Sequence, residues 1–256
     1  SYIYYLNFMN SNNSEARTRG SSLTVEAYAN LEQQYIWHDC DPGFDDAVAL
    51  AMLTAGQEMY KSKLIGVSTV GGNSNLDHCT INARKMLQLA KHEGSRDVYP
   101  GANRPLIRAR MFAEEVHGET GLDGTTTLGK IHLPEQAPDV ARHGSAIAAM
   151  YKGIMATPKG TCWLLCTGPL TNAAILLSAH GDELCEHLKG LCFMGGAIAL
   201  GNNNSSTEFN IAADPDAAKI VIETWGSKLK QCVMVPLDVT TVALTTDLVR
   251  QRLRDI

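Results

Sequence analysis

The sequence has no long apolar run, no excess of positive charge and no paired cysteine motif, and each absence excludes a class of protein. A helix that spans a bilayer needs about 20 mainly apolar residues, whereas the apolar run 47–53 soon gives way to glycine, glutamine and glutamate. With 22 basic and 27 acidic residues, the formal net charge is -5, which gives no broad attraction to nucleic-acid phosphates or anionic lipid. We therefore predict that the protein binds neither membranes nor nucleic acid and that its partner is a small molecule.

The seven cysteines are odd in number, scattered, and without the paired short spacings of a zinc site. Most lie in apolar runs such as 162–166, where a free cysteine is typically a small buried hydrophobe. We predict reduced, buried thiols and a cytoplasmic protein. The cysteines are Cys40, Cys79, Cys162, Cys166, Cys185, Cys192 and Cys232.

Residues 1–34 contain polar segments and no apolar core followed by a small-residue cleavage site, which is what a secretory signal would show. We predict a flexible leader over 1–34 and one α/β domain over 35–256. A chain of 256 residues, 45% of them hydrophobic, is long enough to bury the core of such a domain.

From Tyr35 onward, short apolar runs alternate with longer helical runs, which is typical of an α/β domain built on a mainly parallel sheet with helices on both faces. Asp214 followed by Pro215 is a strong helix start, because aspartate caps a helix well and proline suits its first position. We predict strands at Tyr35–Cys40, Leu64–Val70, Val98–Tyr99, Cys162–Cys166, Gly190–Met194 and Gln231–Leu237. We predict helices at Asp45–Ala55, Leu76–Lys91, Arg142–Met155, Leu170–Ala179 and Pro215–Thr224.

The segment 101–139 is rich in glycine, proline and threonine and has little periodicity. We predict a long functional loop with short helical pieces there. In doubly wound folds, ligands bind at the carboxyl ends of the strands. The residues directly after each predicted strand are therefore the candidates for a site.

The first predicted strand leads into four aspartates within eight positions, Asp39, Asp41, Asp45 and Asp46. Alternation along a strand puts the first two on the same side, and the proline-glycine pair between them and the last two turns the chain into the next helix. Carboxylates this close repel and hold either a shared proton or a cation, and oxygen ligands select a hard ion such as calcium or magnesium. Complementing a helix dipole, worth ~0.3–1 kcal/mol, would explain only Asp45 and Asp46. We therefore predict a metal site.

Polar groups also follow other predicted strands. A glycine turn after the second strand presents Asn73, and a bend after the fourth can aim the carbonyl of Thr167 at a metal. The segment after the fifth strand offers Asn202, Glu208 and Asn210, whose amides and carboxylate suit sugar hydroxyls. Each motif alone is also compatible with an ordinary loop or helix cap. With the aspartate cluster, they favour one site.

Five motifs carry a resemblance: 39–46 (Asp-Cys-Asp-Pro-Gly-Phe-Asp-Asp), 72–73 (Gly-Asn), 117–121 (His-Gly-Glu-Thr-Gly), 167–172 (Thr-Gly-Pro-Leu-Thr-Asn), and 208–210 (Glu-Phe-Asn) ahead of Asp214-Pro215. In this order they closely resemble the inosine-uridine-preferring nucleoside hydrolase family, from about Tyr35 to the end of the chain. The resemblance implies a Rossmann-like nucleoside hydrolase fold. It also implies hydrolysis of ribonucleosides to ribose and free base, in purine and pyrimidine salvage.

The resemblance further implies a division of roles. Asp41 and Asp46 bind Ca²⁺ with the backbone carbonyl of Thr167, and Asp41 takes the proton of the water that attacks the anomeric carbon. His117 is the other catalytic candidate and lies near the base. Carboxylates near the ribose stabilise its developing positive charge. The ribose-binding residues are Asp45, Asn73, Asn202, Glu208 and Asn210. The resemblance favours a homodimer or homotetramer and leaves the preferred base open.

Some features depart from the family. Its members continue into a segment with a further metal-binding aspartate and, in some, a histidine that protonates the base, so we expect a truncated domain with an incomplete calcium shell. His38 occupies a position that is usually apolar, and we interpret it as a hydrogen-bonded core histidine rather than a ligand. Phe44 is at a variable position, and we predict that it packs beside the sugar or the next helix without a catalytic role.

Two other functions stay open at this point. Haloacid-dehalogenase-like phosphatases also begin with Asp-x-Asp after a first parallel strand and use an aspartate nucleophile. They have threonine or valine shortly after the second aspartate, however, whereas Pro42 and Gly43 follow here. The other alternative is a calcium-binding homologue that kept the fold and lost the activity.

Overall fold

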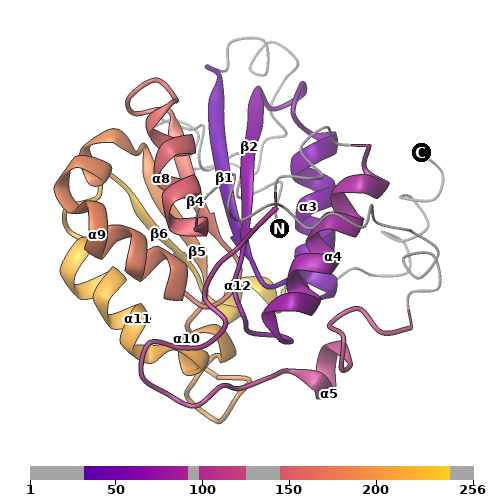
Figure 1. Ribbon diagram of the computed structural model, residues 1–256. Coiled ribbons are helices and arrows are strands. Elements are labelled where there is room, and N and C mark those ends of the chain that lie inside the picture. Colours follow the sequence, from indigo (N-terminus) through magenta and orange to yellow (C-terminus); the bar gives the residue numbers. More distant parts are fainter. Residues whose placement is uncertain (1–31, 92–97, 125–144, 243–256) are drawn as a thin grey trace.

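The computed structural model describes residues 32–91, 98–124 and 145–242, which form an α/β domain around one twisted sheet (Figure 1). The sheet has six strands, all parallel, in the order β3-β2-β1-β4-β5-β6. The predicted fold class is therefore confirmed. The strands are β1 (Gln34–Cys40), β2 (Ser62–Thr69), β3 (Val98–Pro100), β4 (Cys162–Cys166), β5 (Gly190–Met194) and β6 (Cys232–Val235).

Helices cover both faces of the sheet because successive strand residues point to opposite sides. Along β1, Ile36 packs in one hydrophobic cluster with Leu50 and Leu87, whereas Trp37 belongs to a second cluster with Met150. The first layer holds α3 and α4, and the second holds α8, α9 and α11 (Figure 1). These helices are α3 (Phe44–Ala55), α4 (Leu76–Leu89), α8 (Ala146–Met155), α9 (Thr171–His187) and α11 (Pro215–Lys219).

Every predicted strand is present, and β4 and β5 have the predicted bounds. The last one is shorter than predicted because the ladder ends at Val235. Pro236 has no N–H to donate and instead precedes a short helix, α12 (Leu237–Thr240). All seven cysteines are free, and six are buried as predicted, whereas Cys232 on the outer strand β6 is exposed.

Several helix ends differ from the prediction. The helix predicted to stop at Ala179 runs to His187, because the chain kinks at Gly181 (φ 44°, ψ -125°), a backbone conformation open to glycine, and then forms further helical turns. Asp214 caps α11 by accepting from the N–H of Ala217, as predicted, but α11 ends at Lys219 and a π-helical turn, η3 (Ile220–Trp225), follows. The short helix α5 (Glu114–His117) lies in the segment predicted to contain short helical pieces, whereas α10 (Phe209–Ala213) and α12 were not predicted.

Some predictions fall on residues outside the described ranges. These include nearly all of the leader 1–34, residues 142–144 at the predicted start of α8, and residues 125–139 of the predicted loop. Within the described ranges, no helix combines the length and the apolar character needed to cross a membrane.

The strand order places a reversal between β1 and β4. The chain goes outward from β1 through β2 to β3 and then continues on the other side of β1 with β4, β5 and β6. The backbone N–H of Thr167, just after β4, donates to the carbonyl of Asp39 on β1 at 2.9 Å. Parallel sheets bind ligands at the carboxyl ends of the strands on either side of such a reversal. The motifs at 39–46 and 167–172 meet there.

Candidate active site

A cavity of about 570 Å³ opens at this edge of the sheet. Asp41 and Asp46 lie beneath its lining, each at most 1% exposed. The other predicted site residues all line the cavity, together with residues of α5 and the segment before it. The lining comprises Asp45, Asn73, Phe112, Ala113, Glu114, Glu115, Val116, His117, Thr167, Met194, Asn202, Asn203, Glu208, Phe209 and Asn210.

The two buried carboxylates are held by backbone and amide groups. Asp41 accepts from the N–H of Asn73 at 2.7 Å, and the Asn73 side chain donates to the carbonyl of Asp41 at 3.0 Å. Asp46 accepts from the N–H of Gly43 at 3.2 Å and from the hydroxyl of Thr167. These contacts fix Asp41 and Asp46 side by side beneath the cavity.

Burial raises the pKa of both groups. The pKa of Asp41 is raised well above its ordinary value, first by desolvation and then by the charge of Asp46. The pKa of Asp46 is raised to about 7, first by desolvation and then by the charge of Asp45. Two carboxylates in this position favour either a proton or a bound cation.

The donors fit a hard cation by type. Oδ1 of Asp41 is buried and has no hydrogen-bond partner among the described residues, which leaves an oxygen available to a ligand. Gly72 and Gly168 enclose this carboxylate so closely that a Cβ at either would lie 2.1 Å and 2.6 Å from its oxygens. The carbonyl of Thr167 accepts from Asn210 Nδ2 at 2.9 Å.

The protein donors are few. The described part of the chain has no group of three or more histidine, cysteine, aspartate or glutamate side chains placed to hold a metal. Calcium takes about 6–8 oxygen ligands, and two carboxylates with one carbonyl supply fewer.

The residues predicted to hold the sugar converge from three segments. Glu208 caps α10, accepting from the N–H groups of Asn210 and Ile211 at 2.8 and 3.1 Å and from that of Gly196 at 3.0 Å. Burial raises its pKa. Asn202 accepts from the N–H of Phe209 at 2.8 Å and so ties the preceding loop to the same helix. The short helix α10 therefore holds Asn202, Glu208 and Asn210 together at the cavity.

His117 also lines the cavity, on α5. Its Nδ1 accepts from the N–H of Phe44 at 3.2 Å, and the two rings lie 5.5 Å apart between centroids. Burial lowers the pKa of His117, although the charge of Asp45 opposes this. The ring is therefore neutral at physiological pH, with its proton on Nε2. Phe44 packs against this ring, at 40% exposure, rather than only against its own helix.

Comparison with known proteins identifies the family. The sequence profile described as inosine-uridine preferring nucleoside hydrolase matches residues 36–256. The chain belongs to this family. Its predicted membership is thereby confirmed.

Relatives of this nucleoside hydrolase-family chain include an uncharacterized protein of Schizosaccharomyces pombe, 40% identical over 88% of this chain and 64% of that protein. A pyrimidine-specific ribonucleoside hydrolase of Shewanella sp. (strain MR-4) is 38% identical over 85% of this chain and 63% of its own length. The chain thus spans less than two thirds of these relatives.

Solved structures show the same fold. A plant nucleoside hydrolase superposes with a TM-score of 0.67 and 26% identity, over 82% of this chain and 62% of that one. A purine-preferring ribonucleoside hydrolase from Gardnerella vaginalis gives a TM-score of 0.64 and 27% identity, over 80% and 61%. These relatives bear names that differ in the base preferred.

The first aspartate of the family motif has a different environment from Asp41 and Asp46. Asp39 is 1% exposed and does not line the cavity. It accepts from the hydroxyl of Ser68 and from Asn172 Nδ2, the latter at 2.8 Å, and burial raises its pKa to about 7. The carboxylate thus links β1 to β2 and to α9.

Asn172 belongs to the motif 167–172, and the sequence predicted no role for it. It donates to the carboxylate of Asp39 and to the carbonyl of Thr69, and its Oδ1 accepts from the N–H of Ala102 at 2.8 Å. A Cβ at Gly101 would lie 2.3 Å from this amide. The sequence offered one signal for this role, an asparagine close to the start of a predicted helix.

His38 is a buried core residue, as interpreted from the sequence, but only one side of its ring is hydrogen-bonded. Nε2 lies 2.9 Å from the hydroxyl of Thr167, which donates its own proton to Asp46. Nε2 therefore carries the proton, and Nδ1 has no partner in the described part of the molecule. Burial lowers the pKa of His38 to about 3.

We expect His38→Leu to raise the free energy of unfolding at neutral pH by ~1 kcal/mol, because an unsatisfied buried nitrogen costs more than the lost bond contributes. Thr167 keeps its bond to Asp46 in this variant. Denaturant unfolding of the variant and the wild-type chain measures the change. A lower unfolding free energy would show that the His38–Thr167 bond is the larger effect.

Proposed function

We propose that this chain carries the catalytic site of a calcium-dependent ribonucleoside hydrolase, which cleaves the N-glycosidic bond to give ribose and free base. The observation that carries the proposal is the buried pair Asp41 and Asp46 beneath a cavity whose lining is rich in amide and carboxylate groups. Family membership supports the reaction class. Purine and pyrimidine salvage, a cytoplasmic location and a homodimer or homotetramer are further proposals from the same likeness.

Asp41, Asp46 and the Thr167 carbonyl would hold the calcium ion. When bound, it would supply positive charge that favours the deprotonated form of a nearby water. Within the Asp41 carboxylate, Oδ1 is the oxygen without a hydrogen-bond partner among the described residues, so it is the atom that would accept the water proton.

The remaining lining residues bind and stabilise the sugar. Asn73, Asn202 and Asn210 offer amides to ribose hydroxyls, and Asp45 and Glu208 bring negative charge. Positive charge develops on the ribose as the base leaves, and fixed carboxylates stabilise it. Because Glu208 is held by three backbone N–H groups, it cannot move away as that charge forms.

His117 acts on the leaving base. Its Nδ1 is engaged by the Phe44 backbone, so Nε2–H is the group free to donate a hydrogen bond. A donor at this position stabilises negative charge on the departing base nitrogen.

Release of ribose tests this function directly. We expect ribose from at least one of inosine, uridine, adenosine, guanosine and cytidine, and a fall of ~10²-fold or more with a chelator, because a metal ion contributes several kcal/mol to such a step. Added calcium should restore the rate. A reducing-sugar assay measures each point.

Two alternatives are outcomes of the same assay. Calcium binding by calorimetry without any ribose release would identify a silent homologue. Magnesium-dependent phosphate release from a phosphoester would identify a phosphohydrolase. Asp39 argues against the latter, because the carboxylate that would be its nucleophile bonds to Ser68 and Asn172 outside the cavity lining.

A further inference from the structure

The segment between β3 and α5, residues 101–113, is called the strap here because it crosses the carboxyl edge of the sheet and then leads into the cavity wall (Figure 1). Its two ends are bonded to the site. The N–H of Ala102 donates to Asn172 Oδ1 at 2.8 Å, and the N–H of Ala113 donates to the carbonyl of Asn73 at 3.1 Å. Both ends of the strap are thus held by hydrogen bonds.

The middle of the strap is largely exposed, apart from the buried Pro105. In the described residues, two hydrogen bonds tie positions 103–112 to the rest of the chain. The N–H of Leu106 donates to Asp214 Oδ2 at 2.9 Å, and Nε of Arg108 contacts Asp216 Oδ2 at 3.0 Å. Both acceptors belong to the start of α11, 108 positions later in the sequence.

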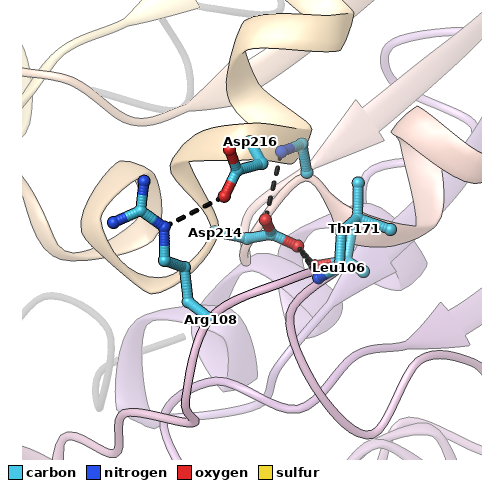
Figure 2. A network of polar contacts seen from close by, with 6 residues as sticks. Leu106, Arg108, Thr171, Asp214 and Asp216 are labelled. Carbon is cyan, nitrogen blue, oxygen red and sulfur yellow. Dashed lines mark hydrogen bonds and ion pairs between the residues drawn. The ribbon is translucent and has the colours of Figure 1, made fainter.

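Asp214 is the buried one of these acceptors. It is 0% exposed and accepts three hydrogen bonds, from Leu106 N–H, from the Thr171 hydroxyl at 2.6 Å and from Ala217 N–H at 3.0 Å. Figure 2 shows its carboxylate between the strap and the first turns of two helices. Hydrogen bonds to a carboxylate are about twice as strong as neutral ones. Asp216 and Arg108 form a partly exposed pair, which water weakens.

The strap ends in residues that form one wall of the cavity. Phe112, Ala113 and the four residues of α5, through His117, all line it. Asp214 itself does not line the cavity. We propose that Asp214 is a positioning residue for nucleoside binding: it holds the strap at Leu106, so that the wall from Phe112 to His117 stays against the substrate. The substrate half of this proposal rests on the proposed hydrolase function.

Asp214→Asn separates the two roles of the carboxylate, which are to cap α11 and to hold the strap. Asparagine caps helices as well as aspartate, so its oxygen can keep the bond to Ala217 N–H. Its NH₂ group then faces the N–H of Leu106, and two donors cannot bond to each other. Thr171 can turn its hydroxyl and accept from that NH₂. The variant therefore removes the bond to the strap and leaves the start of α11 intact.

The first measurement is hydrogen exchange of the whole chain, followed in peptides that cover 101–117. We expect Asp214→Asn to speed exchange there ~10-fold, about the effect of losing one hydrogen bond, with α9 and α11 unchanged. Thr171→Val is the matched control, because it removes a donor to the same oxygen from the helix side and leaves the Leu106 bond. Arg108→Met tests the outer pair and should change exchange little.

The second measurement is steady-state kinetics on the best nucleoside. We expect KM to rise ~5- to 10-fold in Asp214→Asn with kcat within about 2-fold, because the wall contributes binding while the reacting groups stay in place. Thr171→Val should keep both values. A merely structural role would lower the active fraction, and so kcat, without this split.

Leu106→Pro approaches the same bond from the strap, by removing its N–H while leaving Asp214 untouched. It replaces Asp214→Asn if that variant does not fold. Wild-type exchange in 107–117 in both variants would overturn the proposal, and so would faster exchange with an unchanged KM. If the wild-type chain releases no ribose from any nucleoside, the proposed function fails, whereas the exchange measurement still decides whether Asp214 holds the strap.

Discussion

Asp41→Asn is expected to abolish ribose release while leaving the fold intact. The change is nearly isosteric, and the amide oxygen can still accept from the N–H of Asn73. It removes the unpartnered Oδ1 that is proposed as the base, and one of the two carboxylates proposed to hold calcium. Loss of a general base alone lowers kcat by ~10²–10⁴-fold, and loss of the metal ligand adds to this.

Although activity is lost, the stability of the folded chain should not fall. A buried carboxylate beside Asp46 is costly unless a cation is bound, which is why its pKa is raised. Without calcium, we therefore expect the unfolding free energy of Asp41→Asn to be at least as high as that of the wild type, and up to ~1 kcal/mol higher. The reducing-sugar assay and thermal unfolding in the presence of chelator measure the two effects.

Asp77→Asn is the matched control, because Asp77 is exposed in the first turn of α4 and lies outside the cavity lining. It should keep the wild-type rate. Wild-type ribose release by Asp41→Asn would contradict the assignment of both the base and the metal ligand. An equal loss of activity in Asp77→Asn would point to a general effect of lost negative charge.

Gly72→Ala is expected to inactivate the site through a steric contact. A Cβ at this position would lie 2.1 Å from Oδ2 of Asp41 and 2.8 Å from Pro169. Asp41 would have to leave its bond to Asn73 N–H, or the turn after β2 would have to move. Overpacking of this kind costs ~1–3 kcal/mol. We expect that loss of stability and a fall in kcat of ~10²-fold or more, since the proposed general base would be displaced.

Gly71→Ala is the control from the same turn. Its nearest neighbour would be the carbonyl of Asn103 at 3.0 Å, a tight contact that does not involve the carboxylates. A smaller loss of stability and a rate near wild type are expected. If Gly71→Ala and Gly72→Ala lose activity equally, the turn as a whole matters and the close approach to Asp41 does not. Gly168→Ala meets the same carboxylate from its other side at 2.6 Å and should resemble Gly72→Ala.

Predictions from the sequence were most reliable for features that a few neighbouring residues determine. The strands β4 and β5 follow directly from short apolar runs, and the cap of α11 follows from Asp214 and Pro215. The helix end predicted at Ala179 was wrong, because packing of Leu184 in the core stabilises further turns beyond the kink at Gly181. Short helices such as α5 have no periodicity to detect, since they hold only four or five residues.

The aspartate motif shows how far spacing can go. The sequence indicated a cluster after β1, and the structure places Asp41 and Asp46 together beneath the cavity. Spacing alone could not separate Asp39 from them, because its partners Ser68 and Asn172 come from 29 and 133 positions away. Whether a carboxylate meets hydrogen-bond donors or another carboxylate depends on what the fold brings beside it.

By itself, the sequence determined an α/β domain with parallel strands, the family, and the residue types at the strand ends, because hydrophobic periodicity and turn residues act over short distances. Only the tertiary structure decided which of these polar groups share a cavity, which are buried, and which form hydrogen bonds to other protein groups instead of to water. Desolvation and hydrogen bonding depend on neighbours that are remote in sequence. The raised pKa values of Asp41 and Asp46, the half-bonded ring of His38 and the bond from Asp214 to the strap all arise in this way.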